Sequence, residues 1–252
     1  MEYLLTLIRS LKPLLTDRSM SQEITEKGRA DFVTAVDTAV QARVKAALAE
    51  KYPDIQFMGE EGEKGGIDFT KKVWILDPVD GTTNLIHDFK MSAVSLGLLD
   101  NGEPVLGIVY NPFTDELFYA EKGRGAYLND EKISVSDEAH VKNSLIAFGT
   151  SPYDKQLADE NFAMIKKAYL LSADIRRAGS AALDLAYIAC GRTDIFFERN
   201  LKPWDYCAGI CLVNEAGGRV TNMKGGAVTF DRNSDILATN GLVHNEAMEI
   251  TG

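Results

Sequence analysis

The chain has 252 residues, of which 45% are hydrophobic and 25% charged, the composition of an ordinary globular protein that can bury a full core. Its formal net charge of −10 argues against a nucleic-acid or anionic-membrane surface, because such binding depends on Lys and Arg neutralising phosphates. A small phosphorylated substrate stays possible, provided that cations occupy the acidic site.

Cysteine usage and the N-terminus indicate the compartment. The three cysteines are odd in number and show no Cys-x-x-Cys spacing, which is typical of buried free thiols in a reducing environment. Glu2 stands where a signal peptide would be basic, and no apolar run approaches transmembrane length. We therefore expect a cytoplasmic protein that does not enter a membrane.

The first 52 residues predict two helices separated by a polar loop. An amphipathic helix is expected over residues 3–15, ending near Pro13, and a mobile loop over residues 19–29. A second helix is expected to run to about Tyr52. Its apolar face consists of four valines at helical spacing, Val33, Val36, Val40 and Val44.

Acidic residues stand at two points around this helix. Asp37 lies on its apolar face, where a carboxylate needs a partner. The Thr-x-x-Asp spacing from Thr34 is that of a capping box, so a capping role and a functional role are both open. Glu60 and Glu61 follow a predicted strand over residues 55–58, and paired acids of this kind are usually solvated charge.

The stretch after residue 72 has the strongest chemical pattern. Val73–Leu76 predicts a buried strand, and the proline after Asp77 stops it at that carboxylate. Asp80 follows three residues later, and Gly81 permits a tight turn. Thr82–Asn84 are residues that favour a helix start. Two acids beside a helix N-terminus suggest a site for a cation and an anion together.

Two other interpretations of Asp77–Gly81 are open at this point. The segment has good turn chemistry and could be only a turn. It also resembles the Asp-x-Asp-Gly-Thr signature of haloacid-dehalogenase phosphatases, in which the first Asp is phosphorylated. In that signature the acids are two apart, whereas Asp77 and Asp80 are three apart and would not point the same way from an extended chain.

The rest of the chain predicts a mixed α/β sandwich without repeats. Short apolar runs predict antiparallel strands over residues 94–99, 105–110 and 117–120. The second half alternates strands and helices, with strands over 145–148, 174–178 and 194–197 and helices over 159–169 and 181–190. A helix opens at Trp204-Asp205 and is closed by Gly217-Gly218, and a last helix starts at His244.

Two acids in this half also have ordinary explanations. Asp205 has the position of a plain helix N-cap. Glu198 ends a predicted strand, where α/β sheets present ligand-facing groups, but it could equally be a surface acid paired with Arg199 or Lys202.

The motifs together resemble the inositol monophosphatase family, within the lithium-sensitive, magnesium-dependent phosphatase superfamily. Asp77-Pro78-Val79-Asp80-Gly81-Thr82-Thr83-Asn84 matches the family motif Asp-Pro-(Ile/Val/Leu)-Asp-Gly-Thr-x-Asn. Trp204-Asp205, with Glu215-Ala216-Gly217-Gly218, matches the second motif. Residues 33–37, 59–61 and 179–182 are further landmarks in the right order. The resemblance implies a five-layered αβαβα sandwich, one domain with lobes at roughly 1–140 and 141–252, and a homodimer.

The resemblance also implies roles for individual residues. Glu60, Asp77 and the Val79 carbonyl would hold a first Mg²⁺ and Asp77, Asp80 and Asp205 a second, while a weaker third ion would lean on Glu60. Asp37 and Thr82 would position the attacking water, and the Gly81 and Thr82 amides would receive the phosphate. The alcohol side would be lined by Gly179, Ser180, Ala181, Glu198 and Arg176.

These roles lead to an expected function, a Mg²⁺-dependent phosphomonoesterase acting on inositol 1-phosphate or a related polyol or sugar phosphate. Fructose-1,6-bisphosphatase or 3′-phosphoadenosine 5′-phosphate phosphatase activity is the alternative within the same chemistry, with Arg176, Arg177 and Lys202 as candidates for holding a second phosphate. A non-catalytic regulatory protein on this fold is the alternative from another class.

Overall fold

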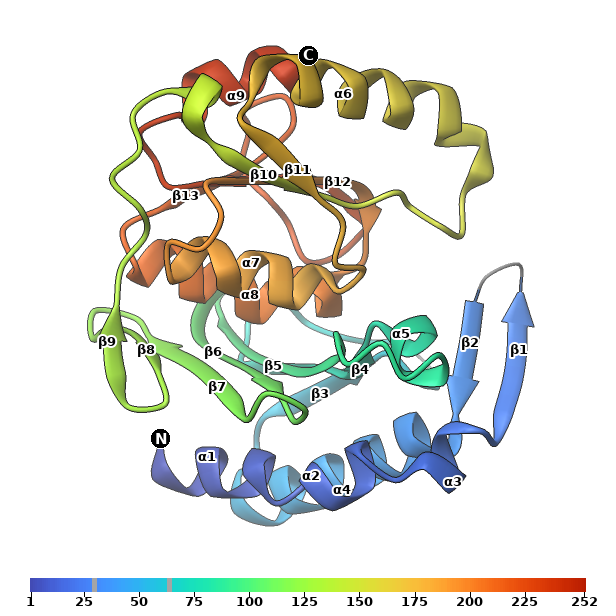
Figure 1. Ribbon diagram of the computed structural model, residues 1–252. Coiled ribbons are helices and arrows are strands. Elements are labelled where there is room, and N and C mark those ends of the chain that lie inside the picture. The colour runs from blue at the N-terminus through green and yellow to red at the C-terminus, as the bar shows by residue number, and fades with distance from the viewer. Residues whose placement is uncertain (29–30, 63–64) are drawn as a thin grey trace.

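The computed structural model describes residues 1–28, 31–62 and 65–252. Figure 1 shows helices below a large sheet, a pair of helices in the centre, a smaller sheet, and further helices on top. This arrangement is the five-layered αβαβα sandwich that the sequence predicts. Two short strands, β1 (Ile24–Gly28) and β2 (Asp31–Thr34), pair antiparallel at one side of these layers.

The large sheet has the strand order β3-β4-β5-β6-β7-β8-β9 in the described part of the chain. β4 runs parallel to β3, and the later neighbours pair antiparallel. The bounds of its strands are β3 Gln56–Gly59, β4 Val73–Asp80, β5 Ala93–Asp100, β6 Glu103–Asn111, β7 Glu116–Glu121, β8 Gly125–Leu128 and β9 Glu131–Ile133.

The smaller sheet has the order β11-β10-β12-β14-β13, again within the described residues. β10 lies parallel to both of its neighbours, whereas β14 runs antiparallel to β12 and β13. The bounds of its strands are β10 Leu145–Phe148, β11 Asp174–Arg176, β12 Ile195–Leu201, β13 Arg219–Asn222 and β14 Ser234–Thr239.

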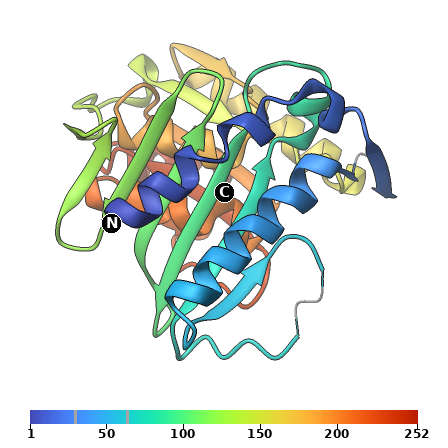
Figure 2. The same cartoon turned by 90° about the horizontal axis from the view of Figure 1, so that it is seen from below.

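Helices cover both sheets and fill the space between them (Figures 1 and 2). Below the large sheet lie α1 (Glu2–Arg9), α2 (Lys12–Leu15) and α4 (Ala35–Lys51), with α3 (Arg18–Ser21) beside them. The central pair is α7 (Ala181–Ala189) and α8 (Pro203–Glu215). The remaining helical segments are α5 Thr82–Ile86, α6 Ala158–Leu171, α9 His244–Thr251 and the 3₁₀ turns Val141–Asn143 and Lys155–Leu157.

The strand β4 is buried on both faces, which explains its continuous apolar sequence. Val73 and Ile75 belong to the core between the two sheets, whereas Trp74 and Leu76 belong to the core beneath the large sheet. On the central side, α8 lies very close to the large sheet, since a Cβ on Gly107 would stand 2.2 Å from the Ala208 carbonyl oxygen. The glycine thus lets the helix that carries Asp205 rest directly on the sheet that carries Asp77.

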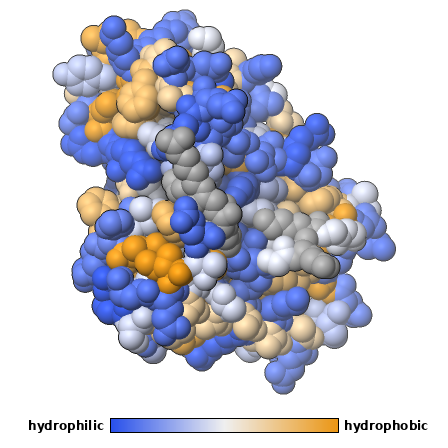
Figure 3. Space-filling view, turned by 90° about the vertical axis from the view of Figure 1, so that its right-hand side faces the viewer, coloured by the Kyte–Doolittle hydropathy of each residue, from blue (hydrophilic) through white to orange (hydrophobic). Residues whose placement is uncertain are grey.

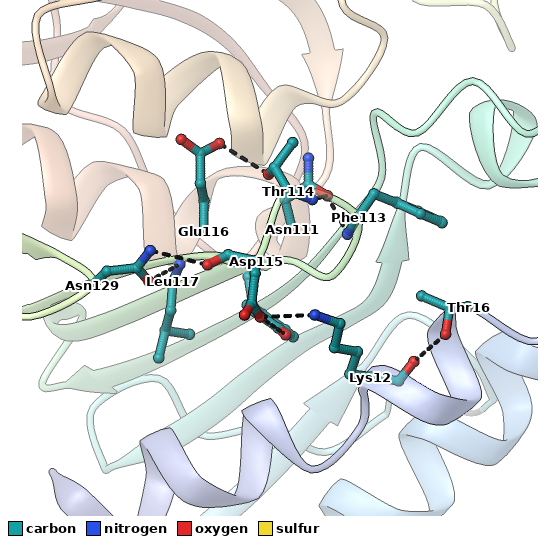
Figure 4. Close-up of polar contacts among 10 residues, drawn as sticks. Lys12, Thr16, Asn111, Phe113, Thr114, Asp115, Glu116, Leu117 and Asn129 are labelled. Carbon is teal, nitrogen blue, oxygen red and sulfur yellow. Dashed lines mark hydrogen bonds and ion pairs between the residues drawn. The ribbon is translucent and has the colours of Figure 1, made fainter.

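The N-terminal helices are tied to the large sheet by polar contacts at the turn between β6 and β7 (Figure 4). Lys12 Nζ lies 3.2 Å from Asp115 Oδ1. The same carboxylate accepts a hydrogen bond from the Tyr110 hydroxyl at 2.6 Å. Asn129 closes the turn by donating to the Asp115 carbonyl and accepting from the Leu117 amide. The Lys12–Asp115 pair joins the lowest helical layer to the β6–β7 turn, and the other contacts hold the turn itself.

Three N-terminal predictions were wrong. The expected helix over 3–15 is two helices, because Pro13 lacks an amide hydrogen and stands in the first turn of α2. The expected loop over 19–29 contains the end of α3 and all of β1, and residue 29 lies outside the described residues. Val33 belongs to β2, because the N-cap residue Thr34 starts α4 only at Ala35.

Most later elements agree with the sequence-based predictions. The strand over 145–148 is confirmed with its bounds, and Gly217, at φ 92°, follows the last turn of α8 as the expected C-terminal cap residue. The strand expected over 174–178 ends at Arg176, and the one expected over 194–197 continues to Leu201. None of the helices within the described ranges is long and apolar enough to cross a membrane.

Candidate active site

The candidate site begins where β4 leaves the sheet. The pairing of β4 with β5 shifts register between Asp77 and Asp80, so two acids three apart in sequence can face one region. Gly81 follows with φ 88°, a left-handed conformation that favours glycine, and α5 starts at Thr82. Asn84 donates to the carbonyls of Met91 and Ala178 and thereby joins this turn to the turn before α7.

Three carboxylates from two elements meet in a first acidic group. One oxygen from each of Asp77, Asp80 and Asp205 lies within 4.8 Å of the others. Asp80 accepts hydrogen bonds from Ser180 Oγ at 2.5 Å and the Ala182 amide at 2.7 Å, which orient it from the start of α7. Asp205 is not the expected N-cap, because Lys202 has that position and α8 starts at Pro203. As the third residue of the helix, Asp205 accepts from the Lys202 amide at 2.8 Å and so contributes to the cap while standing in the group.

A second acidic group consists of Asp37, Glu60 and Glu61, whose carboxylate oxygens also lie within 4.8 Å of one another. Gln41 holds the loop after β3 in place, because its side chain donates to the Glu61 carbonyl and accepts from the Glu61 amide. Glu61 was not among the predicted ligands. Its position directly after Glu60 is the only sequence feature that points to this role, and from sequence alone a pair of acids in a loop cannot be distinguished from solvated charge.

The two oxygens of Asp37 have different partners. Oδ2 accepts from the Thr34 amide at 2.8 Å and from Thr34 Oγ1 at 2.6 Å, which confirms the capping box. Oδ1 accepts from Thr82 Oγ1 at 3.2 Å. The Thr82 hydroxyl also lies 3.0 Å from the Val79 carbonyl oxygen. Asp37 therefore caps α4 and at the same time faces the turn after β4, so the two interpretations of the sequence are compatible.

Burial and mutual repulsion raise the pKa of several of these carboxyls. Burial raises the pKa of Asp77 well above its usual range, and the neighbouring charges of Glu60, Asp80 and Asp205 raise it further. Burial raises the pKa of Asp80 to about 6, against the opposing hydrogen bonds from the start of α7. Carboxylates packed this closely need cations to remain ionised together. The donor set consists of hard oxygens, which suits Mg²⁺.

A cavity of about 180 Å³ opens beside the first acidic group. Its walls come from β2, the end of β4, α5, the connection from β10 to α6, β12 and the starts of α7 and α8. Figure 3 faces the side of the molecule on which β1, β2 and α5 lie, and much of the coloured surface there is hydrophilic. The residues that line it are Phe32, Asp80, Gly81, Thr82, Thr83, Pro152, Tyr153, Arg177, Gly179, Ala181, Glu198, Leu201 and Asp205.

The structure distinguishes the two adjacent arginines. Arg177 lines the cavity, and its positive charge partly opposes the rise that burial causes in the pKa of Asp80 and of Glu198. Arg176 pairs with Asp174 and does not line this cavity. The family resemblance implies Arg176 as the lining residue, with Arg177 only as a candidate for holding a second phosphate. The strand β11 ends at Arg176, so alternation along a strand could not decide between the two.

Glu198 is buried, with only 8% of its surface exposed, and is not a surface acid. Its Oε1 accepts a hydrogen bond from the Ser151 amide at 2.9 Å, and its neighbour Arg199 pairs with Glu160 instead. Burial raises the pKa of Glu198 to about 7. Tyr153 lies in the same cavity and was not predicted, because nothing in the sequence links residue 153 to Glu198.

Comparisons with known proteins agree with this geometry. The chain matches the model of the inositol monophosphatase family over residues 4–251. It is 42% identical over 228 residues to an inositol-1-monophosphatase of a Synechocystis species, covering 89% of this chain and 78% of that protein. It is 39% identical over 203 residues to a protein named Nus factor SuhB from Xylella fastidiosa, covering 80% of this chain and 73% of that protein.

The fold comparison gives the same result. The crystal structure of the extragenic suppressor protein suhB from Bartonella henselae superimposes with a TM-score of 0.91 at 36% identity, covering 98% of this chain and 96% of that one. With the family model matching almost from end to end, and with both acidic motifs assembled in the expected fold, the chain belongs to the inositol monophosphatase family.

Proposed function

We propose that this protein is a Mg²⁺-dependent phosphomonoesterase that hydrolyses inositol 1-phosphate or a related polyol or sugar phosphate. The observation that carries the proposal is the convergence of two acidic groups, Asp77–Asp80–Asp205 and Asp37–Glu60–Glu61, at the start of α5. The name of the Synechocystis relative supports the substrate class. With the carboxylates holding cations, water is the nucleophile and no covalent intermediate is needed.

The residues divide between two principal cation positions. Glu60, Asp77 and the Val79 carbonyl would hold the first, and Asp77, Asp80 and Asp205 would hold the second. Glu60 supports a weaker third position, to which Glu61 adds a carboxylate in the group around Asp37. Bound Mg²⁺ ions supply positive charge that activates water and stabilises the attacking and leaving oxygens of an in-line displacement.

The chain's own groups handle the water and the phosphate. Asp37 Oδ1 and the Thr82 hydroxyl, 3.2 Å apart, orient the attacking water, and Asp37 takes up its proton as general base. The first amides of α5 have no acceptor within the helix. The amides of Gly81 and Thr82 therefore donate to the phosphate oxygens, which are favoured at a helix start.

The alcohol part of the substrate lies toward α7 and β12. Gly179, Ala181 and Glu198 line this end of the cavity, while Ser180 acts through Asp80. Arg177 takes the lining position that was first assigned to Arg176. A carboxylate accepts hydrogen bonds from neighbouring hydroxyls, so Glu198 favours a polyol over a second phosphate.

Two alternatives remain as outcomes of the test. Arg177 lines the cavity and would bind a second phosphate in fructose 1,6-bisphosphate or 3′-phosphoadenosine 5′-phosphate. Lys202, the other candidate, has its ammonium group over the Tyr153 ring, 4.9 Å from its centre. The second alternative is a regulatory role beside catalysis, and it is motivated by the Xylella relative, whose name is that of a Nus factor and not of an enzyme.

We also propose a homodimer of single-domain subunits with lobes at 1–140 and 141–252. The 60% exposed side chain of Phe89 is an apolar group available for such a contact.

The test is phosphate release from a panel of polyol, sugar and nucleotide phosphates. The assay contains Mg²⁺ at about 5 mM, because the proposed site consists of hard oxygen donors. The proposal predicts that inositol 1-phosphate or another polyol monophosphate is among the best substrates. Release from none of the panel by folded protein would overturn it. Preference for a bisphosphate would select the first alternative.

A further inference from the structure

The segment Gly149–Tyr153, here called the 149–153 loop, closes around the Glu198 carboxyl group. The Ser151 amide donates to Glu198 Oε1 at 2.9 Å, and the Gly149 amide donates to the Phe197 carbonyl at 3.0 Å. A Cβ on Gly149 would stand 1.8 Å from Glu198 Cδ and 1.9 Å from Oε2. Any larger residue at position 149 would therefore force the carboxyl group to move.

The loop is itself held in a defined shape. Ser151 has φ 47°, an uncommon conformation for a residue with a side chain, and its hydroxyl donates to the Arg199 carbonyl at 2.7 Å. The buried side chain of Asn161, on α6, donates to the Thr150 carbonyl at 3.1 Å. The loop is thus fixed from β12 on one side and from α6 on the other, and it can hold Glu198 in one position.

The same loop contributes a wall of the cavity. Tyr153 lines the cavity together with Glu198, and 53% of its surface is exposed. The Lys202 ammonium lies 4.9 Å from the centre of the Tyr153 ring, an attraction that favours one ring position. An aromatic ring offers a surface for C–H groups, while a carboxylate accepts hydrogen bonds from hydroxyls.

We propose that the 149–153 loop determines the specificity for the alcohol part of the substrate, which is a cyclic polyol. Gly149 and Ser151 are positioning residues that act through Glu198, and Tyr153 contacts the C–H face of the polyol ring. This inference rests on the proposed phosphatase function. It adds to that function a defined loop, distant in sequence from the acidic motifs, on which the preference for a polyol depends.

The experiment is a double-mutant cycle between positions 149 and 198. Gly149→Ala displaces the carboxyl group, and a Glu198→Ala background lacks the three atoms that lie nearest to the added methyl group. Gly65→Ala is the matched control, because a Cβ there meets no atom within 4 Å. KM and kcat are measured for inositol 1-phosphate and for p-nitrophenyl phosphate, which has no hydroxyl for Glu198 to contact.

Gly149→Ala is expected to raise KM for inositol 1-phosphate at least tenfold while kcat/KM for p-nitrophenyl phosphate stays within twofold. In the Glu198→Ala background the added methyl group should change neither substrate by more than twofold. Equal losses on both substrates, or the same further loss without the Glu198 carboxyl, would overturn the inference. If Gly149→Ala fails to fold, Ser151→Gly replaces it, with an expected threefold or greater rise in the same KM only.

Binding of inositol 1-phosphate to each folded variant, measured by calorimetry with Ca²⁺ in place of Mg²⁺, separates this inference from the proposed function. Weaker binding by Gly149→Ala in a protein that hydrolyses no phosphate ester would sustain the loop and overturn the phosphatase. Active hydrolysis with unchanged binding by Gly149→Ala would sustain the phosphatase and overturn the loop.

Discussion

Replacement of Asp37 by Asn separates the two roles of this side chain. Oδ2 caps α4 through Thr34, and Oδ1 faces the Thr82 hydroxyl. An Asn side chain can keep its oxygen toward the Thr34 amide and turn its NH₂ group toward Thr82 Oγ1, which can accept a hydrogen bond. The substitution therefore retains the cap but removes the negative charge that a general base needs.

The two effects differ strongly in expected size. The free energy of unfolding should change by less than about 1 kcal/mol. The cap is retained, and the negative charge is no longer present, whose burial is disfavoured and raises the pKa of Asp37. The rate should fall much further, since loss of a general base costs about 10²–10⁴ in kcat. Urea unfolding and Mg²⁺-dependent phosphate release from inositol 1-phosphate measure the two quantities on the same preparation.

Thr34→Ala is the matched control for Asp37→Asn. It removes the capping hydroxyl and should cost about 0.5–2 kcal/mol of stability. The Thr34 amide still donates to Asp37, so kcat should stay within a factor of about five, well below the effect of losing a base. A wild-type kcat in Asp37→Asn would refute the assignment of Asp37 as general base. A loss of kcat that is proportional to the loss of unfolding free energy in both variants would refute it as well.

Three further predictions concern other residues and ions. Li⁺ at millimolar concentration should inhibit by competing with Mg²⁺, as the family resemblance implies, and kinetics at limiting Mg²⁺ that show no inhibition would contradict this. Glu198→Gln should lower kcat/KM for inositol 1-phosphate by an amount equivalent to about 1–3 kcal/mol and hardly affect p-nitrophenyl phosphate; parallel losses would assign Glu198 to the fold or the metal site. Burial lowers the pKa of His244 to about 4, so the neutral ring stabilises the fold fully above about pH 6.5, and this contribution of about 2–3 kcal/mol is lost as the pH drops toward 4. Urea unfolding should find a smaller loss in His244→Gln, and an equal loss in that variant would refute the role.

The sequence predicts best where local chemistry and tertiary structure agree. The run Val73–Leu76 followed by Asp77 and a proline defines both the buried strand β4 and the carboxylate at its end. The Gly81 turn and the start of α5 follow from the same local pattern. The meeting of Asp77, Asp80 and Asp205 in one group could also be predicted, because the family motifs imply a fold that brings the end of β4 to the start of α8.

The remaining errors have physical causes. Val33 has helical spacing with Val36, Val40 and Val44, but Thr34 is the N-cap residue, so the helix starts at Ala35, two residues after Val33. Residues 24–28 have Ile24 as their one large apolar residue and pair with β2, a contact that no local pattern reveals.

Long-range packing explains the parts of the cavity that sequence analysis missed. Arg177 follows the last residue of a three-residue strand, and Tyr153 reaches the cavity only because the 149–153 loop folds over Glu198. Contacts of this kind depend on β11, β10 and β12 being neighbours in the smaller sheet, and the sequence near either residue carries no signal for that order.

The central claim is that Asp77, Asp80 and Asp205 hold a cation on which hydrolysis depends. The most direct measurement is phosphate release from inositol 1-phosphate as Mg²⁺ is titrated into EDTA-treated wild type, Asp80→Asn and Asp205→Asn. We predict no turnover without Mg²⁺, recovery in the wild type, and loss of turnover in both variants at limiting Mg²⁺ with the fold intact, because hard cations depend on charged oxygen donors. Full activity in excess EDTA, or wild-type activity of both variants at limiting Mg²⁺, would contradict the claim.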